Sequence, residues 1–232
     1  MGKKADEERI SMRKRRRGSR SGGSTSTTPE RYLYLVLDDW FLGYSIRKIG
    51  LSIGDDEQTC LPLPSAMFQV EAQRELPMYF AVAFGSNIIA MHPKHDMKDG
   101  DKQHAIAFDV REKALSYGPR PNEDLPDPIF IPVRDKLFAL GGSFQRLDPP
   151  PQDEPEGSWA WHKLDHPPFD TRYVTSYAVH PDGTIYVSIG GFLDDATYSF
   201  DVSENKDETS VVWDYKGQWL LPFMGRVHYN HA

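Results

Sequence analysis

The sequence has little that would place the protein outside the cell or in a membrane. Its single cysteine, Cys60, cannot form a disulfide bond within the chain, and no apolar run approaches the roughly 18 residues needed to span a bilayer. The basic N-terminus lacks the apolar segment of a secretory signal. We therefore expect a protein of the nucleus or cytoplasm that has no membrane partner.

Sequence motifs that carry catalysis are also missing. There is no Gly-x-Ser-x-Gly elbow, no phosphate-binding loop and no paired-cysteine zinc signature. His92 and His95 are three residues apart beside Asp96, but no third partner follows in the sequence. We therefore predict that the protein is not an enzyme and that it has no catalytic residues, no metal site and no cofactor.

Charge is divided unevenly along the chain. Residues 1–20 hold nine Lys or Arg and three Asp or Glu, a net charge of +6, so the total of −7 leaves −13 for the remainder. An acidic body repels a phosphate backbone. We therefore expect the folded part to have no nucleic-acid partner.

Residues 1–28 are of low complexity, at first basic and then rich in Ser, Gly and Thr. A segment of this kind cannot bury enough apolar surface to offset the entropy of ordering it, so we predict a disordered tail. Within it, a basic block is a candidate nuclear-localisation signal: Arg13, Lys14, Arg15, Arg16 and Arg17. A solvated tail that no receptor reads is the alternative.

Short apolar strands recur at a nearly constant spacing in residues 29–232. Aligning Ile89, Phe138 and Tyr186 gives steps of 138 − 89 = 49 and 186 − 138 = 48 residues. A period near 50 with short loops, apolar strands and glycines is typical of kelch-type propeller blades. The sequence thus predicts an all-β fold, a kelch-type β-propeller.

Further repeat markers agree with this period. The pairs Phe108-Asp109 and Phe200-Asp201 are 200 − 108 = 92 residues apart, close to two periods. Trp159 and Trp161 are two residues apart and share one face of a strand; packing is the favoured role and ligand stacking the alternative. The remaining structural markers are Gly141, Gly142, Gly190, Gly191, Trp159 and Trp213.

The period divides the folded region into about four blades. Prolines, which cannot serve a central ladder, separate blades that we predict at approximately 31–64, 79–121, 129–168 and 173–222, with residues 223–232 starting another. Propellers have about 4–8 blades, and we favour an incomplete propeller over a four-bladed ring. An open array of this kind exposes apolar surface at both ends.

Several stretches resemble kelch-like proteins of unknown function that are abundant in plants, especially grasses. Residues 31–40 and 43–46 resemble the opening blade of those proteins, and residues 177–183 and 219–223 fit the same family. The resemblance extends from Arg31 to the end of the sequence. It implies a kelch-like β-propeller and no known catalytic residues.

Three functions remain open at this point. The favoured one is a protein-interaction module that binds an unknown protein partner through the long loops at 92–103 and 148–157, because loops on a rigid scaffold carry recognition. One alternative is a metal- or small-molecule-dependent enzyme that uses the central propeller pocket. The other is a substrate-receptor subunit of a ubiquitin ligase, although residues 1–30 contain no amphipathic helix long enough to bind an adaptor.

Overall fold

A computed structural model describes most of the chain beyond the predicted tail. The described residues are 31–51, 62–72, 77–92, 104–123, 125, 127–150, 159–191, 194–202 and 212–228. The predicted tail 1–28 with its basic block Arg13–Arg17, Cys60, and residues 93–103 and 151–157 of the two long loops lie outside the described residues. Within the described part there is no α-helix, only strands, turns and short 3-10 segments.

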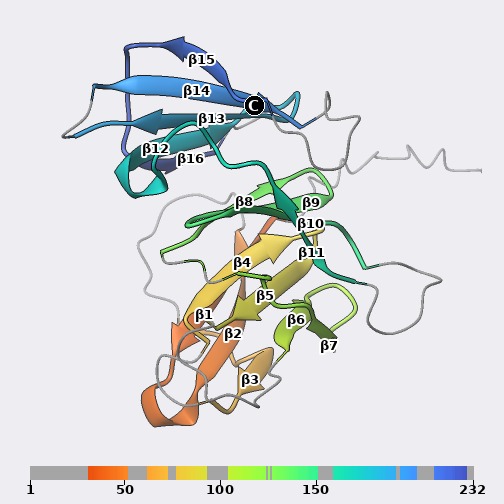
Figure 1. The fold of residues 1–232 in the computed structure, drawn as a ribbon. Coiled ribbons are helices and arrows are strands. Elements are labelled where there is room, and N and C mark those ends of the chain that lie inside the picture. Colours follow the sequence, from red (N-terminus) through yellow and green to blue (C-terminus); the bar gives the residue numbers. More distant parts are fainter. Residues whose placement is uncertain are drawn as a thin grey trace, which may run out of the picture.

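Four sheets follow one another along the chain (Figure 1). The first contains β1 (Arg31–Asp38), β2 (Tyr44–Leu51) and β3 (Phe68–Val70). The second contains β4 (Tyr79–Ala83), β5 (Asn87–Met91), β6 (Ala105–Asp109) and β7 (Ala114–Gly118). The third contains β8 (Ile129–Val133), β9 (Lys136–Leu140), β10 (Phe144–Leu147) and β11 (Trp161–Leu164).

The fourth sheet has five strands. These are β12 (Val174–Val179), β13 (Thr184–Ile189), β14 (Ala196–Asp201), β15 (Asp214–Gly217) and β16 (Gly225–Val227). Neighbouring strands in all four sheets are antiparallel, except that β16 runs parallel to β12. The prediction of an all-β fold is confirmed, and the succession of antiparallel sheets is that of an incomplete β-propeller.

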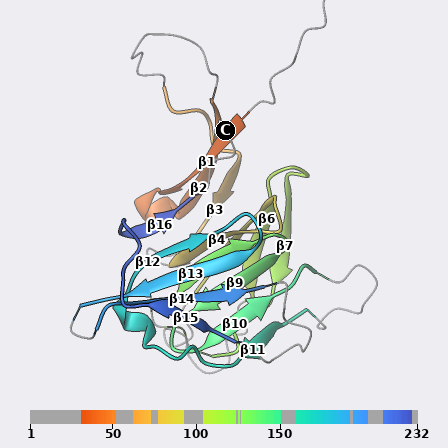
Figure 2. The same ribbon diagram turned by 90° about the horizontal axis from the view of Figure 1, so that it is seen from above.

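Three hydrophobic clusters join the sheets in chain order. One cluster brings together Ile46 of the first sheet and Phe108 of the second. The next joins Ala81 of the second sheet to Leu137 of the third, and the last joins Phe138 of the third sheet to Ile185 and other residues of the fourth. Among the described residues no such cluster joins the fourth sheet to the first, so each end of the array has an outer face without a neighbouring sheet. Figure 2 shows β1 and β2 extending away from the other sheets.

Two strands lie where the predicted blade limits do not place them. The third strand of the first sheet, β3, lies beyond the predicted range 31–64 because Phe68 pairs with Ile46 and packs its ring 5.3 Å from that of Phe108. Residues 223–232 were predicted to start another blade, but β16 pairs with β12 as a fifth strand of the last sheet. The physical reason is the open edge of β12, whose unpaired backbone groups accept any neighbouring extended segment.

Candidate functional site

The repeat markers take equivalent places in the second and fourth sheets. Phe108 lies on β6 and Phe200 on β14, both buried, and Asp109 and Asp201 are the last residues of those strands. The Asp109 carboxylate accepts hydrogen bonds from the Ser86 hydroxyl and from two backbone N–H groups that follow it. These bonds lower the pKa of Asp109, and they tie the end of β6 to the β4–β5 turn.

Sequence reasoning missed the corresponding position of the third sheet. Leu147 pairs with Leu137 as Phe108 pairs with Ile88 and as Phe200 pairs with Ile185, so Asp148 is the counterpart of Asp109 and Asp201. The signal was a large apolar residue followed by Asp. The period does not reveal the pair Leu147-Asp148, because only three residues, 141–143, join β9 to β10 and the pair therefore comes earlier than the period predicts.

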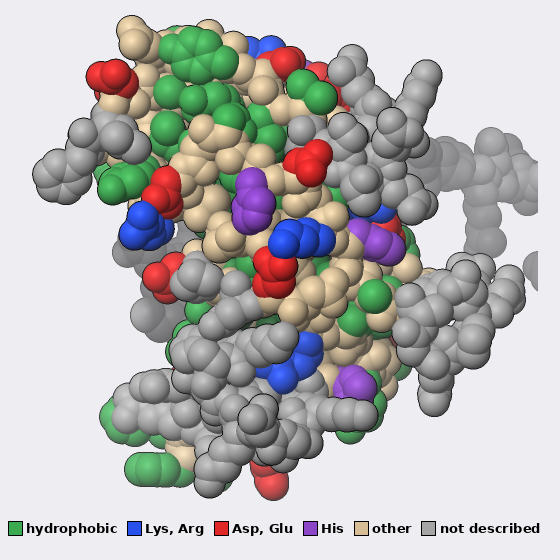
Figure 3. Space-filling view, viewed as in Figure 1, with side chains coloured by type: hydrophobic (Ala, Val, Ile, Leu, Met, Phe, Trp, Pro, Cys, Tyr) green, Lys and Arg blue, Asp and Glu red, His purple; other side chains and the backbone are tan. Residues whose placement is uncertain are grey.

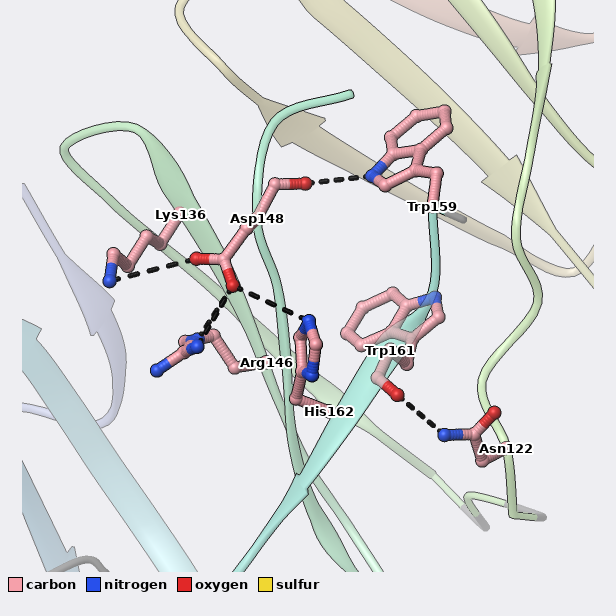
Figure 4. Close-up of polar contacts among 7 residues, drawn as sticks. All are labelled: Asn122, Lys136, Arg146, Asp148, Trp159, Trp161 and His162. Carbon is pink, nitrogen blue, oxygen red and sulfur yellow. Dashed lines mark hydrogen bonds and ion pairs between the residues drawn. The ribbon is translucent and has the colours of Figure 1, made fainter. Parts of the chain in front are cut away.

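Asp148 is the centre of a polar cluster at one end of three neighbouring strands of the third sheet (Figure 4). Its carboxylate lies 2.9 Å from Nη2 of Arg146, 3.6 Å from Nζ of Lys136 and 3.7 Å from Nε2 of His162. The three basic side chains come from β9, β10 and β11. One carboxylate thus holds three strands together, and Arg146, whose side chain is 10% exposed, needs this partner because a nearly buried charge must be paired.

The two tryptophans with two-residue spacing pack inside the protein. Trp161 is 2% exposed and donates its indole N–H to the Pro119 carbonyl at 3.1 Å. Trp159, which precedes β11, donates its indole N–H to the Asp148 carbonyl at 2.8 Å. Its ring packs against the hydrophobic cluster that contains Trp161. Asn122 donates to the Trp161 carbonyl at 2.5 Å. These contacts support the packing role over ligand stacking.

Trp213 is, after Trp159 and Trp161, the third tryptophan that packs against other apolar side chains. It lies beside Phe144, Phe169 and Phe200 with ring centroids 5.2–5.5 Å apart. Its Nε1 is buried and has no hydrogen-bond partner among the described residues. The ring therefore contributes apolar contact, at the expense of an unsatisfied donor.

The glycine markers follow the second strands of the last two sheets. Gly141 and Gly142 come directly after β9, and Gly190 and Gly191 come directly after β13. The Gly141 N–H donates to Ser143 and the Gly190 N–H to Tyr173. The bond of Gly141 lies within the turn after β9, whereas that of Gly190 continues the pairing of β13 with the segment that leads into β12.

The described part of the chain shows no group of side chains arranged to hold a metal ion. No three His, Cys, Asp or Glu side chains there lie close enough together to share a metal ion. Glu123 pairs at 2.5 Å with Lys163 on the surface, and that hydrogen bond lowers the pKa of Glu123. In the Asp148 cluster the carboxylate pairs with basic side chains from three strands, an arrangement that suits structural pairing of those strands.

An exposed apolar turn is the most unusual surface feature of the first sheet. The 3-10 turn η1 (Trp40–Leu42) joins β1 to β2, and its three side chains are 58%, 89% and 63% exposed in order. Trp40 has a φ of +59°, a left-handed conformation that is rare for a large residue. Its N–H is held by the Asp38 carboxylate at 2.8 Å. Backbone strain tends to occur at functional positions, so this exposed turn is a candidate site.

The outer faces of the two end sheets differ in character. The face of the first sheet that points away from the second carries Leu33, Leu35 and Leu37 of β1 and Ile49 of β2. Leu33 pairs with Ile49, whereas the partners of Leu35 and Leu37 are the polar residues Arg47 and Ser45. None of the four apolar residues belongs to a hydrophobic cluster of the described residues, and Leu33 is exposed.

The fourth sheet instead presents buried hydroxyls on its outer face. Ser188 and Thr197 share a hydrogen bond of 2.7 Å, and residues of the C-terminal segment cover them, since Thr197 donates to the Trp219 carbonyl and Ser188 accepts from the Leu221 N–H. Figure 3 shows hydrophobic side chains gathered at the top of this view, over the fourth sheet. This end is therefore partly closed by the chain itself.

In the described part of the chain, no helix has the length and apolar character to cross a membrane.

Comparison with known proteins gives one family. A search among curated proteins produced no match. The model of a family described as "Protein of unknown function (DUF1668)" matches residues 30–231, nearly the whole of the folded region. The chain therefore belongs to the DUF1668 family.

Proposed function

We propose that this protein is an interaction module that binds another protein through the exposed turn η1 and the adjoining outer face of the first sheet. The observation that carries the proposal is the exposure of Trp40, Phe41 and Leu42, three consecutive apolar residues, at the tip of a hairpin. Large aromatic side chains are enriched at the centres of protein interfaces. The strained backbone at Trp40 supports the same reading.

The backbone behind the turn is closely packed, which suits a recognition surface. Gly43, directly after η1, has a φ of +91°, and a Cβ at this position would lie 1.9 Å from the Val70 carbonyl oxygen. The Asp39 N–H donates to the Gly43 carbonyl at 2.8 Å. The aromatic residues are thus presented on a fixed backbone rather than on a loose loop.

A site-specific cross-linking experiment tests this function. A photoreactive amino acid replaces Phe41, and in a matched control it replaces Tyr117, which is 68% exposed on β7 of the second sheet. In cells that express the protein we expect one protein to cross-link at position 41 and not at position 117. Unlabelled wild-type protein should compete for it, and a Phe41→Ser, Leu42→Ser variant should not.

The same cross-linked bands at both positions, or no competition, would contradict the proposal. Folding does not confuse the result because Phe41 is 89% exposed, so its replacement removes little buried surface. The enzyme and ubiquitin-ligase alternatives remain open, and no contact among the described residues favours either of them.

We also propose that the four sheets are blades of the kelch type. The second strands β5, β9 and β13 begin at Asn87, Lys136 and Thr184, which gives steps of 136 − 87 = 49 and 184 − 136 = 48 residues. A period near 50 supports this class. The comparison that would test it is an experimental structure aligned with kelch propellers, where the second strands should superpose blade by blade.

For localisation we propose the nucleus or cytoplasm. The support is sequence-based: the single Cys60 and the basic block Arg13–Arg17. Microscopy of a fluorescent fusion tests the signal, because replacing the five basic residues with Gln should shift the protein from the nucleus to the cytoplasm. Replacing Lys3, Lys4 and Arg9 instead is the matched control and should leave the distribution unchanged.

A further inference from the structure

A cleft of about 230 Å³ opens where the first strands of the third and fourth sheets end. Its walls are residues 132–134, 179–181, 183 and 226–228. They belong to the β8–β9 turn, the β12–β13 turn and strand β16 with the residue after it, and β12 and β16 lie side by side (Figure 1). Folding brings these three distant segments together, and each contributes a basic or imidazole side chain.

The Arg134 side chain is held in place across two sheets. It lies in the β8–β9 turn with a φ of +54°, and its Nη2 donates to the Asp182 carbonyl of the β12–β13 turn. Its guanidinium rests on Gly183, where a Cβ would lie 3.1 Å from Cζ. A larger residue at position 183 would push the guanidinium away. The turn glycine therefore also provides the space that Arg134 occupies.

The opposite wall is basic as well. Arg226 of β16 lies opposite Tyr177 in the parallel β12–β16 pair, and His228 follows two residues later. Repulsion by the Arg226 guanidinium, together with burial, lowers the pKa of His228. Arg226 thus disfavours the protonated form of its neighbour His228.

The side chains that line the cleft are basic or uncharged. Arg134 and Arg226, both exposed, are always charged, and none of the lining residues is an Asp or Glu. Two carboxylates lie in the flanking turns: Asp135, next to Arg134 in the sequence, and Asp182, whose Oδ2 lies 2.9 Å from Nδ1 of His180. Two guanidinium groups on one cleft whose lining has no carboxylate make it a candidate anion site.

We propose that this basic cleft binds a phosphate monoester, with Arg134 and Arg226 as the two guanidinium donors and His180 and His228 beside them. Guanidinium groups match phosphate oxygens bidentately, and a phosphate monoester carries about −1.5 to −2 charges at pH 7. The volume is below the roughly 300–1,000 Å³ typical of pockets for drug-sized ligands. It therefore suits one phosphorylated group, either on a small metabolite or on a protein side chain, better than a nucleotide.

Calorimetric titration of the full chain tests the site. The ligands are O-phosphoserine, a phosphoserine peptide, the same peptide without phosphate, and glutamate as a carboxylate of similar size. We expect both phosphorylated ligands to bind and the other two to bind at least about tenfold more weakly, since hydrogen bonds to charged groups contribute about 1.5–3 kcal/mol. Tighter binding of the peptide than of O-phosphoserine would identify a protein side chain as the source of the phosphate, and equal binding a small metabolite.

Variants connect the binding to the two arginines. Arg134→Gln and Arg226→Gln should each weaken O-phosphoserine binding by about tenfold or more. Arg226→Lys should recover part of the loss if β16 stays in place. Arg172→Gln is the matched control, because that guanidinium pairs with Asp170 outside the cleft and is 81% exposed, so binding should not change.

Two results would overturn the proposal. One is equal affinity for glutamate and O-phosphoserine, and the other is the same affinity in Arg134→Gln, Arg226→Gln and wild type. The experiment is independent of the protein-binding proposal, because the turn η1 lies in the first sheet and none of its residues lines the cleft.

Discussion

Phe108 and Phe200, 92 residues apart, occupy the same register position in the second and fourth sheets. Each is the next-to-last residue of a third strand, and each pairs with an isoleucine in second place on the neighbouring strand, Ile88 or Ile185. Their exposures are 0% and 2%. Each ring fills the interface with the preceding sheet, Phe108 against Phe68 and Phe200 against Phe138 and Phe144. The repeat in the sequence is therefore a repeat of inter-sheet packing.

Truncating either ring should strongly destabilise the protein. We expect Phe108→Ala and Phe200→Ala each to lower the free energy of unfolding by about 3–5 kcal/mol, because each leaves a cavity in an inter-sheet cluster. Urea denaturation measures this. Tyr117→Ala, at a position 68% exposed, is the control and should change the value by less than about 0.5 kcal/mol. Similar losses in all three variants would contradict the packing role of the two rings, and a large loss at only one of them would contradict their equivalence.

Replacing Gly43 should disrupt the first sheet, whereas replacing Gly50 in the same sheet should not. A Cβ at Gly43 would lie 1.9 Å from the Val70 oxygen and 2.6 Å from the Ala72 nitrogen, on a backbone with φ of +91°. A Cβ at Gly50 meets nothing within 4 Å. We expect Gly43→Ala to cost more than about 1 kcal/mol and Gly50→Ala to cost less than about 0.5 kcal/mol.

Hydrogen exchange locates that effect. In Gly43→Ala the amides of β2 and β3 should lose protection first, because the clash separates this pair of strands. Unchanged protection in the first sheet would show that the β2–β3 approach is looser than described.

Replacing Trp161 and replacing Trp213 by phenylalanine should lower the stability of the protein by different amounts. In Trp161→Phe a hydrogen bond to the Pro119 carbonyl is lost, and an acceptor left unpaired costs about 1–3 kcal/mol. In Trp213→Phe the lost donor had no partner among the described residues, so only the smaller ring counts. We expect thermal denaturation to show the larger loss for Trp161→Phe, and equal losses would refute the assignment.

The Asp182 carboxyl should titrate well below its usual range. Its pKa is lowered from 3.8 to about 2, first by the hydrogen bond from the Thr184 N–H and then by His180. Since the folded pKa lies below the unfolded one, this contribution to stability is present above about pH 4 and is lost as the pH falls through about 2. Carbon-detected NMR of the aspartate carboxyls measures the midpoint.

A His180→Gln variant separates the two causes of that shift. Its Asp182 midpoint should rise but stay below 3.8, because the Thr184 N–H, 2.8 Å from Oδ1, remains. A midpoint of 3.8 in the wild type would show that the turn is not formed as described.

Short-range features were predictable from the sequence because neighbouring residues decide them. The hairpin at residues 180–183 follows from Asp182 and Gly183, whose φ of +99° suits a glycine. The apolar strands and the period near 48 likewise required only local patterns. The Phe-Asp markers were visible because the same residue pair recurs in the sequence at the end of the third strand of the second and fourth sheets.

Long-range pairing was harder to predict, since it depends on which edges and faces meet. The predicted limits of the first blade left out β3. The sequence also did not reveal Asp148, because a loop of only three residues between β9 and β10 shifts that position from the period. The strand β16 was assigned to a new blade, whereas the open edge of β12 captures it. Pairings of this kind follow from spatial proximity, which the order of residues does not state.

The linear pattern of apolar residues, turns and repeat markers thus specified strands, their approximate grouping and an all-β architecture. Tertiary structure alone decided the two surfaces that we propose as binding sites. The left-handed conformation of Trp40 belongs to the folded β1–β2 hairpin, and Arg134 and Arg226 line one cleft only because three distant segments converge. The physical reason is that periodicity acts over a few residues, whereas a binding surface is made of side chains that the packing of whole sheets brings together.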